Sequence, residues 1–172
     1  MKQLYLDIIA KLRAGLTTTA VPHIDVWNDQ VNSIEQQKIY SFATPAVFVE
    51  LFNTNDIQRL GGGYTIYNNL RVRIHVVDQK LDAGDGTQER NLTVFDLKQT
   101  VFSVLDNYEP DRAGMFHRGS EDEDKSHTNI YHFMQEYMTN LVDTFRKLPI
   151  DGVTKAPPTV LELTKTIVDE II

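Results

Sequence analysis

Five residues between positions 117 and 127 have side chains of the types that bind divalent cations: His117, Glu121, Asp122, Asp124 and His127. Carboxylates and histidines together hold a metal ion if their segment folds back on itself. The spacing matches no established metal-binding loop, because the glycine and the regular oxygen ligands of an EF-hand are missing. The alternative interpretation is a solvated hairpin tip whose charges discourage aggregation. We therefore expect no metal and no cofactor, and retain a small metal-dependent enzyme using the 117–127 loop as the alternative function.

Two further patterns lack the context that their chemistry requires. The triple glycine Gly61–Gly63 is followed by strand-like residues, with no helix start and no GK[ST] motif to cradle a phosphate. A hairpin turn or a bulge is expected there instead. Ser126 and His127 are only neighbours in sequence, which carries no triad geometry. These patterns give no support to an enzyme.

Charged side chains alternate with apolar ones between residues 70 and 76. Leu70, Val72, Ile74 and Val76 fall on one side of the predicted strand. A period of two is typical of a strand with one face on a core and the other face polar. The polar side carries Arg71, Arg73 and His75.

The composition limits the class of protein. The 172 residues suit one domain, with 41% hydrophobic and 24% charged residues. The absence of cysteine excludes disulfides and thiolate metal sites. No apolar run approaches the roughly 20 residues that span a bilayer, so a soluble protein without a membrane partner is expected. The formal charge of −7 disfavours nucleic-acid binding, which requires a basic surface.

The elements that must position these residues follow from periodicity and turn signals. They predict an α+β fold, in which an antiparallel or mixed β-sheet with a long hairpin is backed by an N-terminal helix and a mid-chain helix. Residues 1–145 form the domain, and residues 146–172 a proline-marked linker with an extended C-terminal arm. Helices are expected at 3–16 and 88–107, and strands at 46–52, 70–77, 114–119 and 129–142, with a short strand within 22–29 and strand character on both sides of the glycines within 57–67. A long loop is expected at 30–43, and turns at 82–87 and 120–127.

This layout resembles the tail-terminator and head–tail joining (tail completion) proteins of tailed bacteriophages. The resemblance is carried by the hairpin ending in NNLRVRIHVV, by the turn DAGDGT with its following helix, and by the segment FHRGSEDEDKSHTNIYHFMQEYMTNLVD. Arg118, Asp124, Tyr137 and Asp143 stand where such proteins have an arginine-bearing strand, an acidic turn and an aromatic closing strand. The loop at 30–43 and the tail beyond 145 depart from the compact pattern.

The resemblance implies a virion protein, assembled in the host bacterial cytoplasm, that forms a homo-hexameric ring at the head-proximal end of the tail. Such a ring stops polymerisation of the tail tube and docks it to the head connector. It uses no cofactor, and the genome is able to pass through its lumen without sequence-specific contacts.

A ring of identical subunits needs two different faces that fit one another. The cationic residues Arg71, Arg73 and His75 and the acidic residues Glu121, Asp122 and Asp124 are the expected complementary halves, since charge pairs set register and partner choice. In the alternative interpretation, Arg71 and Arg73 face solvent or pair within their own sheet.

Overall fold

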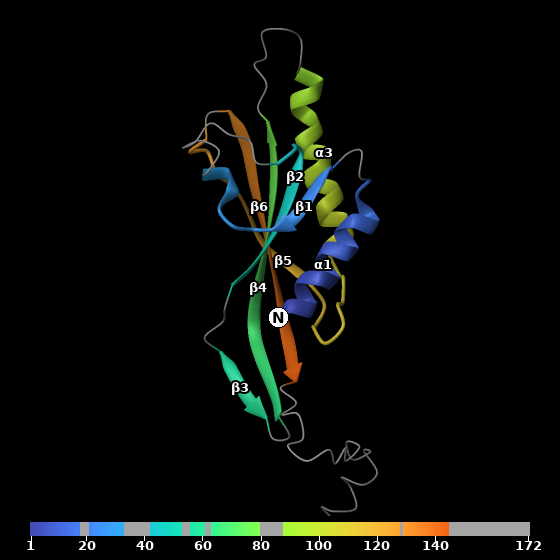
Figure 1. Cartoon of the computed structure of the whole chain (residues 1–172), viewed down its shortest axis with the longest axis vertical. Coiled ribbons are helices and arrows are strands. Elements are labelled where there is room, and N and C mark those ends of the chain that lie inside the picture. The colour runs from blue at the N-terminus through green and yellow to red at the C-terminus, as the bar shows by residue number, and fades with distance from the viewer. Residues whose placement is uncertain are drawn as a thin grey trace, which may run out of the picture.

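The computed structural model describes residues 1–17, 21–32, 42–52, 56–60, 63–79, 88–127 and 129–144. The predicted C-terminal arm, most of the 30–43 loop and the 82–87 turn lie outside the described residues. In chain order the elements are α1 (Lys2–Gly15), β1 (His23–Val26), β2 (Ala46–Phe52), β3 (Ile57–Leu60), β4 (Tyr64–Gln79), α3 (Gln88–Leu105), β5 (His117–Glu123) and β6 (Ile130–Thr144) (Figure 1).

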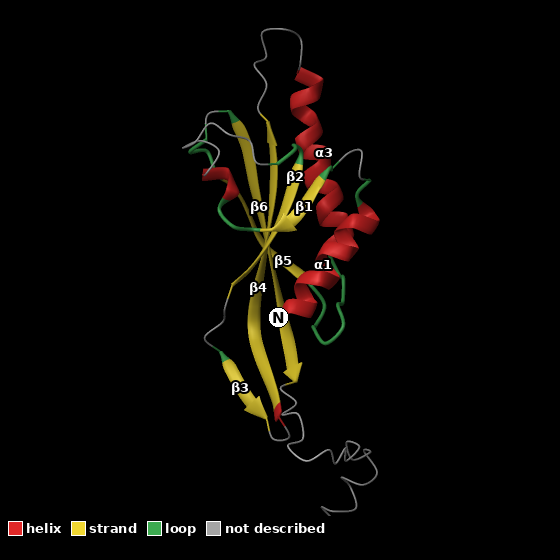
Figure 2. Ribbon diagram, viewed as in Figure 1, coloured by secondary structure: helices red, strands yellow, loops and turns green. Residues whose placement is uncertain are grey.

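The strands form one mixed sheet, which confirms the expected α+β fold. Its order is β1-β2-β4-β6-β5, with β3 paired to the far half of β4. The β1–β2 pair is parallel and every other pair is antiparallel. Helices α1 and α3 lie on one side of the sheet, whereas a helical turn at residues 30–32 lies on the other, as Figure 2 shows. We call this other side, which neither α1 nor α3 covers, the helix-free face.

The main core lies between the helices and the sheet. Leu70, Val72, Ile74 and Val76 are fully buried there, which confirms the predicted alternation along β4. On α1, the residues Leu4, Ile8 and Leu12 recur every four positions and are buried against this side. On α3 the buried apolar residues are Val94, Val101 and Leu105, whereas Leu92 and Phe95 are exposed.

A second, smaller core covers one end of the helix-free face. Trp27 and Val31, which follow β1, pack there over the strands. Phe48 of β2 and Val77 of β4 lie beneath them. This second core makes one end of the helix-free face a protein interior, although the sequence period alone predicts a solvated side.

A bulge in β4 determines which of its side chains face each side of the sheet. The pairing with β6 shifts between Tyr67 and Leu70, where Asn69 adopts a left-handed backbone with φ 51°. The extra residue reverses the alternation, so Ile66 before the bulge and Arg71 after it lie on the same, helix-free face. Leu60 of β3 pairs with Tyr64 of β4; of the triple glycine predicted to turn between them, only Gly63 lies within the described residues, with φ 86°.

One sequence prediction needs correction. The strand expected at 114–119 is β5 at His117–Glu123, so Glu121 and Asp122 belong to a strand and not to a charged turn. Their acidity suits an edge strand, where charge discourages pairing with another chain.

Gly15 is the last residue of α1. A Cβ atom at this position would lie 2.3 Å from Cγ2 of Val104, so glycine allows α1 to approach α3 closely.

No helix within the described residues is long and apolar enough to span a membrane.

Candidate functional site

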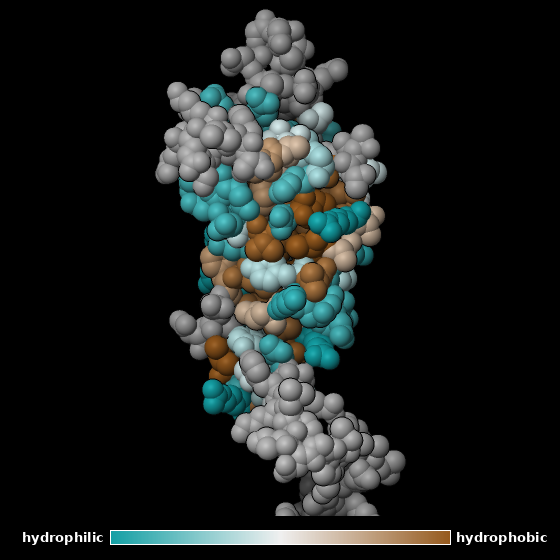
Figure 3. Space-filling model, viewed as in Figure 1, coloured by the Kyte–Doolittle hydropathy of each residue, from teal (hydrophilic) through white to brown (hydrophobic). Residues whose placement is uncertain are grey.

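A row of apolar side chains is exposed on the helix-free face at the end of the sheet remote from the second core. Here β3 and the adjoining parts of β4 and β6 extend beyond both helices (Figure 1). Hydrophobic atoms are exposed at the lower left of Figure 3, where Figure 1 places β3. The register puts five apolar residues on this side, of which Ile66 is half-buried and the other four are exposed. We call them the distal strip: Leu60, Tyr64, Ile66, Met138 and Val142.

The distal strip lies on one side of the sheet, although an exposed apolar residue of β3 also lies on the other side. Leu60 is 50% exposed and pairs with Tyr64, which is 43% exposed. Ile57, in the same strand, is 49% exposed but lies on the opposite side, opposite Tyr67. An apolar row that crosses three strands is uncommon on a monomer surface and is typical of interaction sites.

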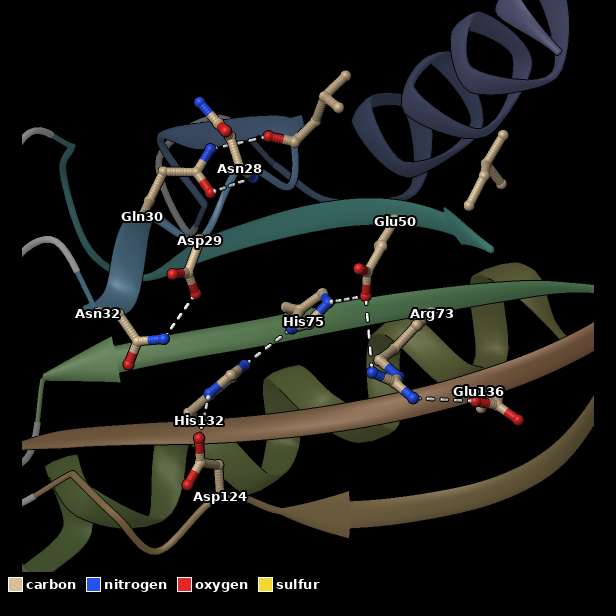
Figure 4. Close-up of polar contacts among 12 residues, drawn as sticks. Asn28, Asp29, Gln30, Asn32, Glu50, Arg73, His75, Asp124, His132 and Glu136 are labelled. Carbon is tan, nitrogen blue, oxygen red and sulfur yellow. Dashed lines mark hydrogen bonds and ion pairs between the residues drawn. The ribbon is translucent and has the colours of Figure 1, made fainter. Parts of the chain in front are cut away.

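A charged cluster follows the distal strip along the helix-free face. Arg73 lies between two carboxylates, with Nη1 3.6 Å from Oε2 of Glu50 and Nη2 3.3 Å from Oε2 of Glu136 (Figure 4). Its guanidinium also lies 4.3 Å from the ring centroid of Phe52. Among the described residues, Arg71 has one ion pair, with Nη1 3.6 Å from Oε1 of Glu136, and its side chain is 61% exposed. Arg73 is therefore held within its own sheet, while most of Arg71 faces solvent.

The third predicted cation, His75, lies in the interior. It is 2% exposed, and the ring of Trp27 stacks on it with a centroid distance of 3.8 Å. Its Nε2 is 3.1 Å from Oε2 of Glu50. Burial lowers the pKa of His75 to about 3, with His132 and Arg73 adding to the effect, so the ring is neutral at pH 7.

His75 is one member of a buried polar chain that the sequence did not reveal. Its Nδ1 is 2.8 Å from Nε2 of His132 (Figure 4). On the other side of that ring, Nδ1 of His132 is 3.4 Å from Oδ2 of Asp124. The same carboxylate oxygen is 3.2 Å from Nε2 of His127. The chain thus connects Glu50 on β2 with the β5–β6 connection through two adjacent imidazoles.

The protonation of this chain follows from its surroundings. Burial lowers the pKa of His132, so this ring is also neutral at pH 7. Hydrogen bonding from Ser126 lowers the pKa of Asp124 to about 2, against the opposing effect of burial. Burial raises the pKa of Glu50, although Arg73 opposes it.

The predicted metal-type cluster is brought together only in part. Asp124 and His127 meet, and their third neighbour is His132 from β6. His117 pairs with Met138, six residues further along β6 than His132, which is roughly 20 Å at about 3.3 Å per residue. Ligand atoms of Asp124, His127 and His132 all lie within 4.8 Å of one another. The pair His75 and His132 was not found from the sequence, because only the register between β4 and β6 places the two residues on one face.

The two acidic residues on β5 point in different directions. Glu121 lies on the helix side, with Oε1 2.6 Å from Nζ of Lys98 and Oε2 3.0 Å from Nη1 of Arg118. Asp122 lies on the helix-free face and is exposed. Of the six predicted interface residues, Arg71 and Asp122 therefore retain charged groups that face solvent.

No protein-family model matches the chain, and no curated protein matches it.

Proposed function

We propose that this protein is a structural subunit that assembles with copies of itself into a ring at the head-proximal end of a phage tail. In this position the ring stops polymerisation of the tail tube and joins the tail to the head connector. The proposal rests on the resemblance of residues 1–145 to tail-terminator and head–tail joining proteins. It is supported by one structural observation, which is the exposed distal strip.

The distal strip favours association with another copy of the chain. An antiparallel sheet is stable with one solvated face when that face is polar, but here the solvated face carries Leu60, Tyr64 and Val142. Burying such side chains against a partner contributes roughly 25 cal/mol per Å² of apolar surface. In a cyclic ring each strip meets a different surface of the next copy, so every strip is covered when the ring closes.

The charges beside the strip provide a second element of recognition. Arg71 lies opposite Met138 of the strip, and Asp122 lies on the edge strand of the same face. We propose that these two residues form contacts between neighbouring copies. Arg73, His75, Glu121 and Asp124 are engaged within the subunit. Exposed charge pairs at a rim set register and association rate more than affinity.

The experiment compares Leu60→Glu with Ile57→Glu by size-exclusion chromatography and light scattering over a range of concentrations. Both positions are on β3 and are equally exposed, but they lie on opposite sides of the sheet. A charge buried in the interface without a partner is costly, so Leu60→Glu is expected to weaken self-association about 100-fold or more. Ile57→Glu is the matched control and is expected to associate as the original protein does.

Phage tails assembled with each variant provide the second readout, observed by electron microscopy. With Leu60→Glu, tails of uncontrolled length or tails without heads are expected. A monomer at every concentration, combined with normal tails carrying Leu60→Glu, would contradict the proposed function.

A further inference from the structure

We propose that Asp124, His127 and His132 bind one divalent transition-metal ion of the Zn²⁺ class, which fastens the β5–β6 connection to β6. The proposal concerns the interior of the subunit and does not depend on the ring. It rests on the positions and the burial of the ligand atoms.

Two of the three separations between the ligand atoms match those around a small tetrahedral ion, and all three atoms lie within 4.8 Å of one another. Oδ2 of Asp124 is 3.2 Å from Nε2 of His127 and 3.4 Å from Nδ1 of His132. An ion about 2.0–2.1 Å from each ligand places tetrahedral ligands about 3.3–3.4 Å apart. Two imidazoles with one carboxylate favour Zn²⁺ and its neighbours over Mg²⁺ or Ca²⁺, which prefer oxygen ligands.

The surroundings of the carboxylate hold it in position for such an ion. Its second oxygen, Oδ1, accepts a hydrogen bond of 3.0 Å from the backbone N–H of Ser126. His127 and His132 are both more than nine-tenths buried. A ligand whose other polar atoms are already bonded within the protein is oriented before the ion arrives.

A count of hydrogens in the buried polar chain indicates the contact at which a cation would fit. Three contacts join Glu50, His75, His132 and Asp124 in series, and each contact between two acceptor atoms requires one hydrogen. Two neutral imidazoles supply two hydrogens. When both carboxylates are ionised, one of the three contacts therefore lacks a hydrogen. Among the described residues, Nδ1 of His132 is buried and has no hydrogen bond of good geometry, with Asp124 at 3.4 Å.

One arrangement of the two available hydrogens leaves Nδ1 of His132 with a lone pair that can bind a metal ion. Nε2–H of His132 donates to Nδ1 of His75, and Nε2–H of His75 donates to Oε2 of Glu50. The lone pair on Nδ1 of His132 then faces Oδ2 of Asp124, and a cation between these two atoms turns a repulsive contact into coordination. In many metal sites the histidine that binds the metal donates its other N–H to a carboxylate. Here the imidazole of His75 lies between that histidine, His132, and the carboxylate of Glu50.

The alternative to a metal ion is a proton on Glu50, which would supply the missing hydrogen. A protonated Glu50 donates to Nε2 of His75, both rings reverse, and Nδ1–H of His132 donates to Asp124. Glu50→Gln imposes this second arrangement, because the amide of glutamine donates where an ionised carboxylate accepts. Glu136→Gln is the matched control, since Glu136 is the other carboxylate beside Arg73 and lies outside the histidine chain.

The experiment titrates the full-length, metal-stripped protein with Zn²⁺ against a chromophoric chelator, and with Co²⁺ by visible absorption. We expect one equivalent of Zn²⁺ and a tetrahedral Co²⁺ spectrum. Trp27, the single tryptophan of the chain, stacks on His75 and is expected to change its fluorescence on binding. Asp124→Asn and His132→Ala should weaken binding more than about 100-fold, and Glu50→Gln about 10- to 100-fold. His117→Ala and Glu136→Gln should leave the affinity unchanged.

Absence of one-equivalent binding by the original protein would overturn the site and leave the proton as occupant. Binding that survives in Asp124→Asn but is lost in His117→Ala would overturn it in favour of surface chelation. Equal affinities of Glu50→Gln and Glu136→Gln would overturn Nδ1 of His132 as the ligand atom. Circular dichroism checks that each variant is folded. The Co²⁺ spectrum is recorded on the original protein and therefore does not depend on the folding of any variant.

Discussion

His75 and His132 are joined by a 2.8 Å contact between Nδ1 and Nε2, although they are not direct partners across the sheet. His75 lies opposite Met134, and His132 lies opposite Val77. The contact is therefore diagonal across the helix-free face, within reach of two imidazole rings. It connects β4 with β6 beneath Trp27, and it joins Glu50 to Asp124 through the protein interior.

The first prediction concerns the polar contacts of His75. We expect His75→Phe to lower the free energy of unfolding by about 1–3 kcal/mol, because it leaves Nε2 of His132 buried without its partner. Phenylalanine keeps a flat ring for stacking on Trp27, so the loss reports mainly on polar contacts. Urea denaturation with chelator present measures it. His117→Phe, on the exposed edge strand, is the control, and equal stability of the two variants would contradict this account.

The second prediction compares the two arginines of β4. Arg73→Met leaves Glu50 and Glu136 without the guanidinium between them, and we expect a loss of about 1–3 kcal/mol in stability. Arg71→Met removes one long ion pair from an exposed position, so a change below about 0.5 kcal/mol is expected. Thermal and denaturant unfolding of the two variants decide between them. A larger loss for Arg71→Met would show that the charge cluster is assigned incorrectly.

The third prediction concerns the close approach of the two helices. Gly15→Ala places a Cβ atom where Cγ2 of Val104 now lies 2.3 Å away, so the helices must separate. We expect a loss of about 1–3 kcal/mol, the usual cost of overpacking. Val104→Ala in the same chain removes the colliding methyl groups and is expected to recover part of the loss. A double-mutant cycle measures the coupling, and purely additive effects would argue against the contact.

The fourth prediction tests the charges proposed to meet between copies. Arg71→Asp and Asp122→Arg are each expected to weaken self-association by up to about 10-fold, because they place like charges together. The double variant restores opposite charges and should recover association. Concentration-dependent light scattering at low salt measures the effect, since salt screens exposed pairs. Failure of the double variant to improve on both single variants would remove Arg71 and Asp122 from the proposed interface.

The sequence predicted the frame of the molecule well, because periodicity reports which side of an element is buried. The apolar alternation of β4 and the four-residue spacing of α1 identified the core side of each. The same alternation assigned His75 to a solvated side, and this was wrong. Alternation cannot show that Trp27, nearly fifty residues away, covers that side.

The site was harder to predict than the fold, because it depends on register. His132 and Asp124 come together with His75 only when β5, β6 and β4 are aligned, and the bulge at Asn69 decides which side chains share a face. A one-residue bulge has a weak sequence signal, since the pair Asn68–Asn69 resembles many turns. The distal strip could not be predicted from the sequence for the same reason.

The most direct test of the proposed assembly is the chemical accessibility of a cysteine in the distal strip. The chain contains no cysteine, so Leu60→Cys and Ile57→Cys each introduce a single thiol. The proposal predicts that a maleimide reacts with both thiols in the monomer, but that assembly protects Leu60→Cys and leaves Ile57→Cys reactive. Equal reactivity of Leu60→Cys in the monomer and in the assembled form would contradict the proposed interface.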